Sequence, residues 1–286
     1  MATPERFPVE SQVNELVATY RAAQRQILAE IRAATLRDDP RQAFRRTAQL
    51  QSVIQTLDQL GYDTDDQARR IVAEAFGQSS KATGKEITRI GVTAPTDSSF
   101  AGVAREAVSA LQESMVGSLT DARQTIGRQA ADVFARAQRR TSMLALLGAE
   151  GSPASARKNL VETLQKQGQT GFVDRAGRRW SLDSYADMAT RTVTRQAVTQ
   201  GAITRMAAHG IDLARISVHA SSCNVCKPWE GRLVSLDGST TDYEGEAVTD
   251  LGALPSGGPP FHPRCKHSLS PVAVRIDAIR RQMQEA

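Results

Sequence analysis

The fold of the first half of the chain is predicted from a pattern in residues 10–36, which read ESQVNELVATYRAAQRQILAEIRAATL. Apolar side chains recur in this stretch at spacings of three and four residues, which places them on one face of an α-helix. These side chains are Val13, Leu16, Val17, Tyr20, Ile27, Leu28 and Ile31. The stretch therefore predicts an amphipathic helix whose apolar face packs against other helices.

The same periodicity continues to residue 147, interrupted by residues that commonly start or end helices. Aspartate or threonine at a helix start caps free backbone N–H groups, and glycine after a helix adopts the left-handed conformation that ends it. Helix starts are predicted at Asp39-Pro40, Asp63, Asp97 and Thr120, and helix ends at Gly61, Gly77 and Gly148. The first half of the chain is therefore expected to be a set of packed helices.

The second half has a different character, and Gly151-Ser152-Pro153 marks the boundary. We expect two domains, a helical domain over 1–152 and an α+β domain over 153–286, so the fold class is mainly α with a small α+β C-terminal domain of short strands. The predicted elements are a helix over 154–167, a hairpin over 171–182 with its turn at 175–177, a helix over 183–209 capped by Asp183, a strand over 213–219, a loop over 237–260, a strand over 269–274 and a helix over 275–285.

Composition and charge exclude several classes of protein. The 286 residues are 40% hydrophobic and 23% charged, which is typical of a folded chain. No apolar run approaches the roughly 18 residues that span a bilayer, and the first eight residues lack an apolar signal segment. We therefore expect neither a membrane protein nor a secreted one. The net charge of +5 is concentrated in residues 153–232, which hold 12 basic and 6 acidic groups, whereas residues 237–250 hold five acids and no base.

A cluster of cysteines and histidines carries the clearest chemical signal. All three cysteines and three of the four histidines lie between residues 219 and 267. Cys223 and Cys226 form a C-x2-C pair, and 35 residues later His262 and Cys265 repeat the x2 spacing. Two such pairs can complete a tetrahedron of three thiolates and one imidazole, which suits structural zinc because no coordination position stays open for water. The pattern predicts a zinc knuckle formed by Cys223, Cys226, His262 and Cys265.

Alternatives to this ligand set stay open at this point. His267 is the alternative fourth ligand and His219 the third choice. Reduced thiols that only pack in a small core, or an oxidised cysteine pair, would also account for the cysteines. Catalytic motifs are absent, because the sequence contains no His-Glu-x-x-His, no Gly-x-Ser-x-Gly and no phosphate-binding glycine loop. We therefore expect no enzyme activity and no small-molecule substrate.

Four other side chains are candidates for contact with a partner. Trp229 follows the C-x2-C pair closely and is expected to pack beside the knuckle or to contact a partner. Arg191, Arg195 and Arg205 lie on the predicted helix over 183–209, where they can be solvated, form salt bridges or contact DNA phosphates.

Three ordered segments carry a resemblance to a known family. They are GRRWSLDSYADM at 177–188, WEGRLVSL at 229–236 and PFHPRCKHSLSP at 260–271. Together they resemble the signature of the tailed-phage minor capsid protein family, and the cysteine pair with His262-Pro263-x-Cys265 is similar to the related Mu-type head morphogenesis domain. The resemblance covers about residues 153–274, and the helical first half shows no matching motif.

The resemblance implies a structural virion protein, present in low copy inside the phage head near the portal vertex and assembled in the host cytoplasm. Its expected partners are the portal protein and the inner capsid, with packaged double-stranded DNA as a further partner and no membrane. Two other classes stay open, namely a virion-delivered enzyme such as a nuclease or transferase, and a zinc-ribbon nucleic-acid-binding protein. An enzyme would need an open metal position, and a zinc ribbon would show salt-steep DNA affinity in the absence of portal.

Overall fold

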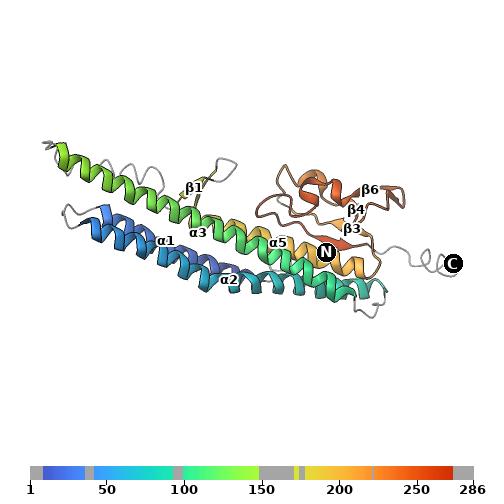
Figure 1. The fold of residues 1–286 in the computed structure, drawn as a ribbon. Helices are drawn as coiled ribbons and strands as arrows, with labels where there is room; N and C mark the ends of the chain where they lie inside the picture. Colours follow the sequence, from blue (N-terminus) through green and yellow to red (C-terminus); the bar gives the residue numbers. More distant parts are fainter. Residues whose placement is uncertain are drawn as a thin grey trace. The chain divides into compact units, whose positions relative to one another are not determined.

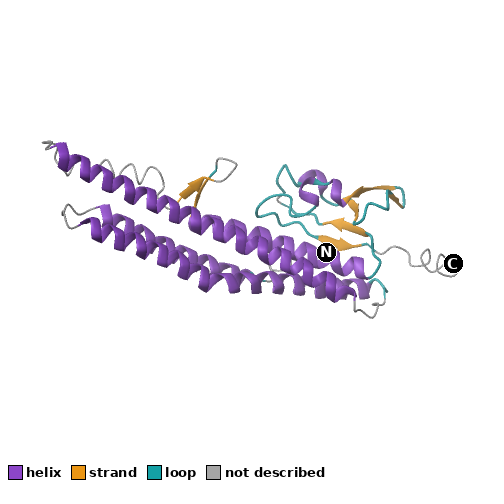
Figure 2. Cartoon of the chain, in the orientation of Figure 1, coloured by secondary structure: helices purple, strands orange, loops and turns teal. Residues whose placement is uncertain are grey.

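The computed structural model describes residues 9–35, 42–92, 99–147, 171–173, 178–220 and 222–272. Helices make up most of these residues (Figure 2). The predicted fold class, mainly α with a small sheet of short strands toward the C-terminus, is confirmed. The chain forms two compact units, one of Ser11–Ala68 and Val116–Asp187 and one of Met1–Glu10, Arg69–Met115 and Met188–Ala286.

Several predicted features fall outside the described residues. These are the helix starts at Asp39-Pro40 and Asp97, the end at Gly148, the domain boundary after residue 152, the helices over 154–167 and 275–285, and the hairpin turn at 175–177. The division between a domain over 1–152 and a domain over 153–286 stays a prediction.

Helix α1 spans Glu10–Thr35 and confirms the helix predicted over 10–36. Most of its apolar face is buried, since Val13, Leu16, Tyr20 and Ile27 are all 0% exposed. The three- and four-residue spacing thus describes a helix face buried against other helices, as its periodicity requires.

Helix α2 runs without interruption over Gln42–Arg89, so the predicted end at Gly61 and restart at Asp63 are wrong. Gly61 gives room to a side chain from another helix, because a Cβ there would lie only 3.0 Å from the Arg123 guanidinium. Asp63 accepts a hydrogen bond from Gln59 one turn earlier, at 2.7 Å, and does not cap a helix. Residues typical of helix ends here serve contacts between side chains.

Helix α3 is likewise continuous over Ser99–Leu147, so the predicted helix start at Thr120 is wrong. The Thr120 hydroxyl does not cap N–H groups but accepts a hydrogen bond from the Arg123 guanidinium at 2.8 Å. The predicted end at Gly77 is also wrong, because that glycine lies inside α2.

Helix α5 spans Leu182–Ala208, close to the predicted range, but its cap is Ser181 and not Asp183. Ser181 and Ser184 exchange hydrogen bonds in both directions between backbone N–H and side-chain oxygen, at 3.0 and 3.4 Å, which is a capping-box arrangement. The short strands β1 (Gly171–Val173) and β2 (Arg179–Ser181) pair antiparallel before this cap and confirm the strands of the predicted hairpin.

A five-stranded sheet lies beside the C-terminal part of α5 in the order β5-β6-β4-β3-β7 (Figure 1). Strand β3 (Leu213–Ile216) pairs antiparallel with both β4 (Leu233–Ser235) and β7 (Leu269–Pro271). Strand β6 (Glu246–Asp250) pairs parallel with β4 and antiparallel with β5 (Asp242–Tyr243). The prediction of a loop over 237–260 is wrong, because this stretch contains β5, β6 and two short 3-10 helices, η2 (Leu251–Ala253) and η3 (Pro255–Gly257).

One hydrophobic core joins this sheet to α5 and to the end of α2. Ala214 and Val234 of the sheet, Met206 of α5 and Ile87 of α2 are all 0% exposed. Cys226 and Cys265 belong to the same core at 1% exposure each. Apolar packing therefore holds these two cysteines in place, and the predicted Cys/His cluster has to form around them.

Gly201 on α5 is expected not to tolerate a side chain. An added Cβ would lie 2.5 Å from the backbone oxygen of Phe76 on α2, a distance that forces backbone to move. We expect Gly201→Ala to lower the free energy of unfolding by about 1–3 kcal/mol, the usual cost of overpacking. Chemical denaturation followed by circular dichroism measures this change.

Gly77→Ala is the matched control, because that helical glycine has nothing within 4 Å of an added Cβ. Alanine is the better helix former by about 0.5–1 kcal/mol, so this control should leave stability unchanged or raise it. Equal stabilities of the two variants would contradict the close approach of α5 to α2.

Candidate metal centre

The first half of the cluster is a tight turn between β3 and the 3-10 helix η1 (Lys227–Trp229). The backbone N–H groups of Cys226 and Lys227 both donate to the carbonyl oxygen of Cys223, at 3.1 and 3.0 Å. This turn brings the two sulfur atoms 3.5 Å apart. Cys223 is exposed and Cys226 is buried, so the loop offers one sulfur to solvent and one to the core.

The second half is a turn that precedes β7. The N–H of Cys265 donates to the carbonyl oxygen of His262 at 3.0 Å, and Arg264 between them adopts a positive φ of 65°. Pairing of β3 with β7 brings this turn beside the first one, and the N–H of Ser217 donates to the carbonyl of Ser268 at 3.0 Å just beyond the strands.

The structure brings together five of the six predicted ligand candidates, all except His219, in two overlapping groups of three that share Cys226. Cys223, Cys226 and His262 form the first group, and His262 Nε2 lies 3.2 Å from the Cys223 sulfur and 3.1 Å from the Cys226 sulfur. Cys226, Cys265 and His267 form the second, with 3.8 Å between the sulfurs and 3.4 Å from Cys265 Sγ to His267 Nδ1.

Within each group of three, these separations are close to those between neighbouring ligand atoms of a tetrahedral metal site. Zinc bonds of about 2.3 Å to sulfur and about 2.0 Å to nitrogen place neighbouring ligand atoms about 3.5–3.8 Å apart. His262 is also oriented for ligation, because its Nδ1 lies 2.7 Å from the carbonyl oxygen of Pro263 and leaves Nε2 directed at the sulfurs. The cluster can therefore hold a metal ion.

The two cysteines of the first loop differ in acidity. The Cys226 N–H beside its sulfur and the neighbouring His262 lower the pKa of Cys223 to about 7. Burial raises the pKa of Cys226 above its ordinary value. A cation next to the buried sulfur would offset this penalty, because a thiolate is the form that binds a metal. The exposed member of the pair is thus readily ionised, and the buried member depends on a positive partner.

Glu230 is the residue that the sequence prediction missed. One oxygen of its carboxylate accepts hydrogen bonds from the Ser222 hydroxyl, from the N–H of His219 at 2.8 Å and from His267 Nε2 at 2.8 Å. The Ser222 and His267 hydrogen bonds lower the pKa of Glu230 to about 2. The side chain of Glu230 is 12% exposed and that of His267 5% exposed.

His219, the third choice for a ligand, lies beside this network. Its Nε2 contacts the Ser217 hydroxyl at 3.0 Å, and its ring stands edge-on to the ring of His267 with centroids 4.7 Å apart. Burial lowers the pKa of His219, with His267 as a second cause. The two groups of metal-compatible side chains among the described residues do not include it.

The candidate partner-contact residues all make contacts within the chain. Trp229 packs against the core that holds Cys226 and Cys265, with the Arg232 guanidinium 5.3 Å from its ring centroid. Nη1 of Arg191 donates to both carboxylate oxygens of Glu10, at 2.8 and 2.9 Å, and Arg205 donates to the Ser80 hydroxyl at 3.0 Å. Burial lowers the pKa of Arg195. A role of these residues in contacting DNA or a partner stays a prediction.

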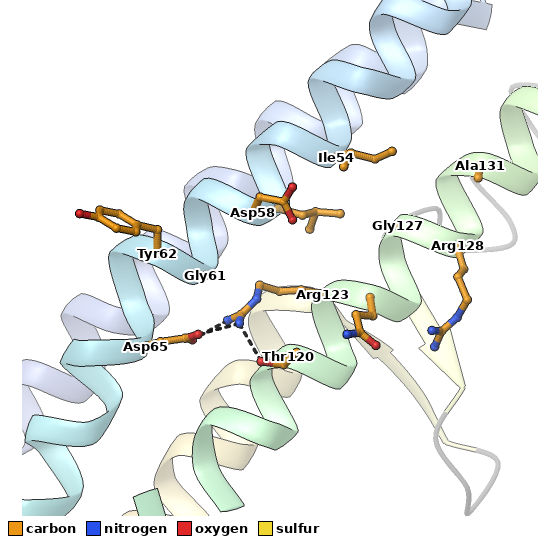
Figure 3. A pocket seen from close by; sticks show the side chains of 12 residues that line it. Ile54, Asp58, Gly61, Tyr62, Asp65, Thr120, Arg123, Gly127, Arg128 and Ala131 are labelled. Carbon is orange, nitrogen blue, oxygen red and sulfur yellow. Dashed lines mark hydrogen bonds and ion pairs between the residues drawn. The ribbon is translucent and has the colours of Figure 1, made fainter. Parts of the chain in front are cut away.

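A second feature of interest is a cavity of about 590 Å³ between α2 and α3 in the helical unit. Figure 3 shows Arg123 between the two helices, joined to Asp65 and Thr120. Two large apolar side chains at the cavity face solvent, since Ile54 is 42% and Tyr62 84% exposed. No helix among the described residues is long and apolar enough to cross a membrane.

Comparison with known proteins places these features in a family. No curated protein and no solved structure is significantly similar to the chain. The family model described as phage minor capsid protein 2, by contrast, matches residues 3–286. Because this match takes in the helical first half together with the Cys/His cluster, the chain belongs to the phage minor capsid protein 2 family and has a structural role in the phage virion.

Proposed function

We propose that the protein is a low-copy component of the phage head that sits inside the head at the portal vertex and joins the portal to the inner capsid. The observation that carries this proposal is the family match over residues 3–286. Residues 1–152 provide the docking half, and residues 153–286 form a module stabilised by a metal ion. No residue acts as a catalyst in this proposal.

The metal in this proposal is zinc, bound by Cys223, Cys226, His262 and Cys265. His262 is preferred to His267 as the fourth ligand because its Nε2 lies within 3.2 Å of two sulfurs, whereas His267 Nδ1 lies 3.4 Å from the Cys265 sulfur. Three thiolates and one imidazole leave no position for water, which favours a structural role. The ion would crosslink two loops 35 residues apart in the sequence, and its binding free energy would add to folding.

Docking through the helical half is supported by the apolar side chains that this half presents to solvent. Ile54 and Tyr62 of α2 both line the cavity beside α3. Exposed aromatic residues next to a cavity are typical anchors of protein interfaces. The portal protein is the partner that we assign to this surface.

Tyr62→Glu is expected to reduce capture of the full-length protein by its cognate portal protein about tenfold or more, as loss of an interface anchor does. Co-sedimentation of purified portal with each variant measures this. Tyr62 is 84% exposed, so the substitution should leave the fold intact. Val218→Glu is the matched control, because Val218 is an apolar residue 70% exposed in the metal-binding module. A loss of binding in the control but not in Tyr62→Glu would move the docking surface to the C-terminal half.

Contact with packaged double-stranded DNA is the second part of the proposal. Its support is the excess of six basic groups in residues 153–232, 12 against 6. Arg191 and Arg205 already make contacts within the chain. The proposal of DNA contact therefore rests on the excess positive charge of the segment and not on any single side chain. Binding to DNA that weakens steeply with salt would support it.

A further inference from the structure

Glu230 occupies an unusual position for a carboxylate. Its side chain is 12% exposed, and one oxygen, Oε1, accepts hydrogen bonds from Ser222, from the N–H of His219 and from His267. For comparison, Glu246 pairs with Arg215 on the surface, where the two side chains are 47% and 43% exposed. A shielded carboxylate with three donors holds its partners more firmly than an exposed pair does.

The partners of Glu230 belong to both segments that carry the candidate ligands. Ser222 directly precedes Cys223, and His267 follows Cys265 by two residues. One oxygen atom therefore links the two halves of the cluster, although Glu230 belongs to neither group of metal-compatible residues.

The hydrogen bond also sets the orientation of the His267 ring. An ionised carboxylate only accepts hydrogen bonds, so the proton of this contact is on Nε2 of His267. The other nitrogen, Nδ1, then faces the sulfur of Cys265 at 3.4 Å. Glu230 thus fixes the ring of His267, which is not one of the four proposed ligands, against the sulfur of the proposed ligand Cys265.

We propose that Glu230 is a positioning residue of the metal centre, which holds the Cys223 loop through Ser222 and the Cys265 segment through His267. The inference rests on the metal site proposed above and adds the residue that organises it. Glu230 does not touch the ion in this arrangement. It keeps the ligands near their binding positions before the ion arrives, so its loss should weaken affinity without changing stoichiometry.

Titration of the metal-free, full-length protein with Co²⁺ tests this inference, because cobalt reports both affinity and ligand geometry through its visible spectrum. We expect Glu230→Ala to bind one ion per chain with affinity about 10–100-fold lower than the unchanged protein, the usual effect of losing an outer partner. The spectrum of the bound ion should also change. Glu230→Gln should show a smaller loss, because its amide oxygen can still accept hydrogen bonds. Glu246→Ala, the matched control, should bind as the unchanged protein does.

A double-variant comparison separates positioning from general destabilisation. If Glu230 acts through His267, the combined Glu230→Ala and His267→Ala variant should lose less affinity than the product of the two single losses. Fully multiplicative losses, or unchanged affinity and spectrum in Glu230→Ala, would overturn the inference while leaving the metal site in place. Failure of the unchanged protein to bind Co²⁺ would overturn the metal site and the inference together. If Glu230→Ala loses its helical circular dichroism signal, the variant is unfolded. The inference is then tested with Glu230→Gln, by the same comparison of affinity and spectrum.

Discussion

Replacing Cys226 with serine is expected to prevent the proposed binding of a metal ion and to unfold the sheet over residues 213–271. Cys226 belongs to both groups of metal-compatible side chains and is 1% exposed. Serine is a poor zinc ligand, and its hydroxyl would be buried in the core without the sulfur contacts. In zinc-finger peptides structural zinc contributes on the order of 10 kcal/mol to folding, comparable with the whole stability of a domain.

Elemental analysis for zinc per chain, with a thiol titration alongside, measures the first effect, and amide hydrogen exchange measures the second. Protection should be lost across residues 213–271 and retained in α1. Val225→Ser is the matched control, since Val225 lies in the same loop between the two cysteines and is 51% exposed. The control should keep its metal and its protection. Full metal content in Cys226→Ser would show that the ligand assignment is wrong.

The apolar periodicity of the sequence predicted the bounds of α1 and α5 closely. Helix α1 ends one residue from its predicted end, and α5 begins one residue before its predicted start. Buried apolar faces such as Leu16 and Tyr20 explain this accuracy, because the helical period shows directly in the order of residues. The Cys/His spacing likewise predicted five side chains that the structure brings together.

Residues typical of helix ends were misleading where tertiary contacts decided their role. Gly61 predicts a helix end and Thr120 a helix start. Both residues instead lie inside long helices, where they accommodate the side chain of Arg123. A glycine signals a helix end only if nothing else requires its small size, and the sequence does not show the neighbouring helix. The strands β5 and β6 were missed for a related reason, since short polar strands carry almost no periodic signal.

Glu230 could not have been identified from spacing. Its partners Ser222 and His267 lie 8 and 37 residues away, and only the pairing of β3 with β7 brings them together. The one available signal was its place in the segment at 229–236 that resembles the capsid family, between the tryptophan and the glycine. Charged residues in loops are mostly exposed to solvent, so the sequence favours an exposed Glu230, whereas its side chain is largely buried.

Arg123→Met is expected to destabilise the helical unit by about 3 kcal/mol, the cost of removing one partner from a largely buried ion pair. The guanidinium of Arg123, on α3, joins three helices through four hydrogen bonds. It donates to Asp65 of α2 at 2.9 and 3.1 Å, to Tyr20 of α1 at 2.8 Å and to Thr120 at 2.8 Å. Methionine fills similar space but leaves the Asp65 carboxylate and the fully buried Tyr20 hydroxyl without this donor. Urea denaturation of the full chain measures the loss.

Arg128→Met is the matched control, because Arg128 is an exposed arginine on the same helix that donates only locally, to Thr125 at 2.9 Å. It should change stability by less than about 0.5 kcal/mol. Arg123→Lys should fall between the two, since lysine keeps the charge but not the planar pair of donors that matches Asp65. The expected order of stability is therefore Arg123→Met lowest, Arg123→Lys intermediate and Arg128→Met highest. This order depends on the geometry of the hydrogen bonds and not on charge alone. If Arg123→Lys were as stable as the control, the link between the three helices would be electrostatic, and the bidentate contact with Asp65 would contribute nothing.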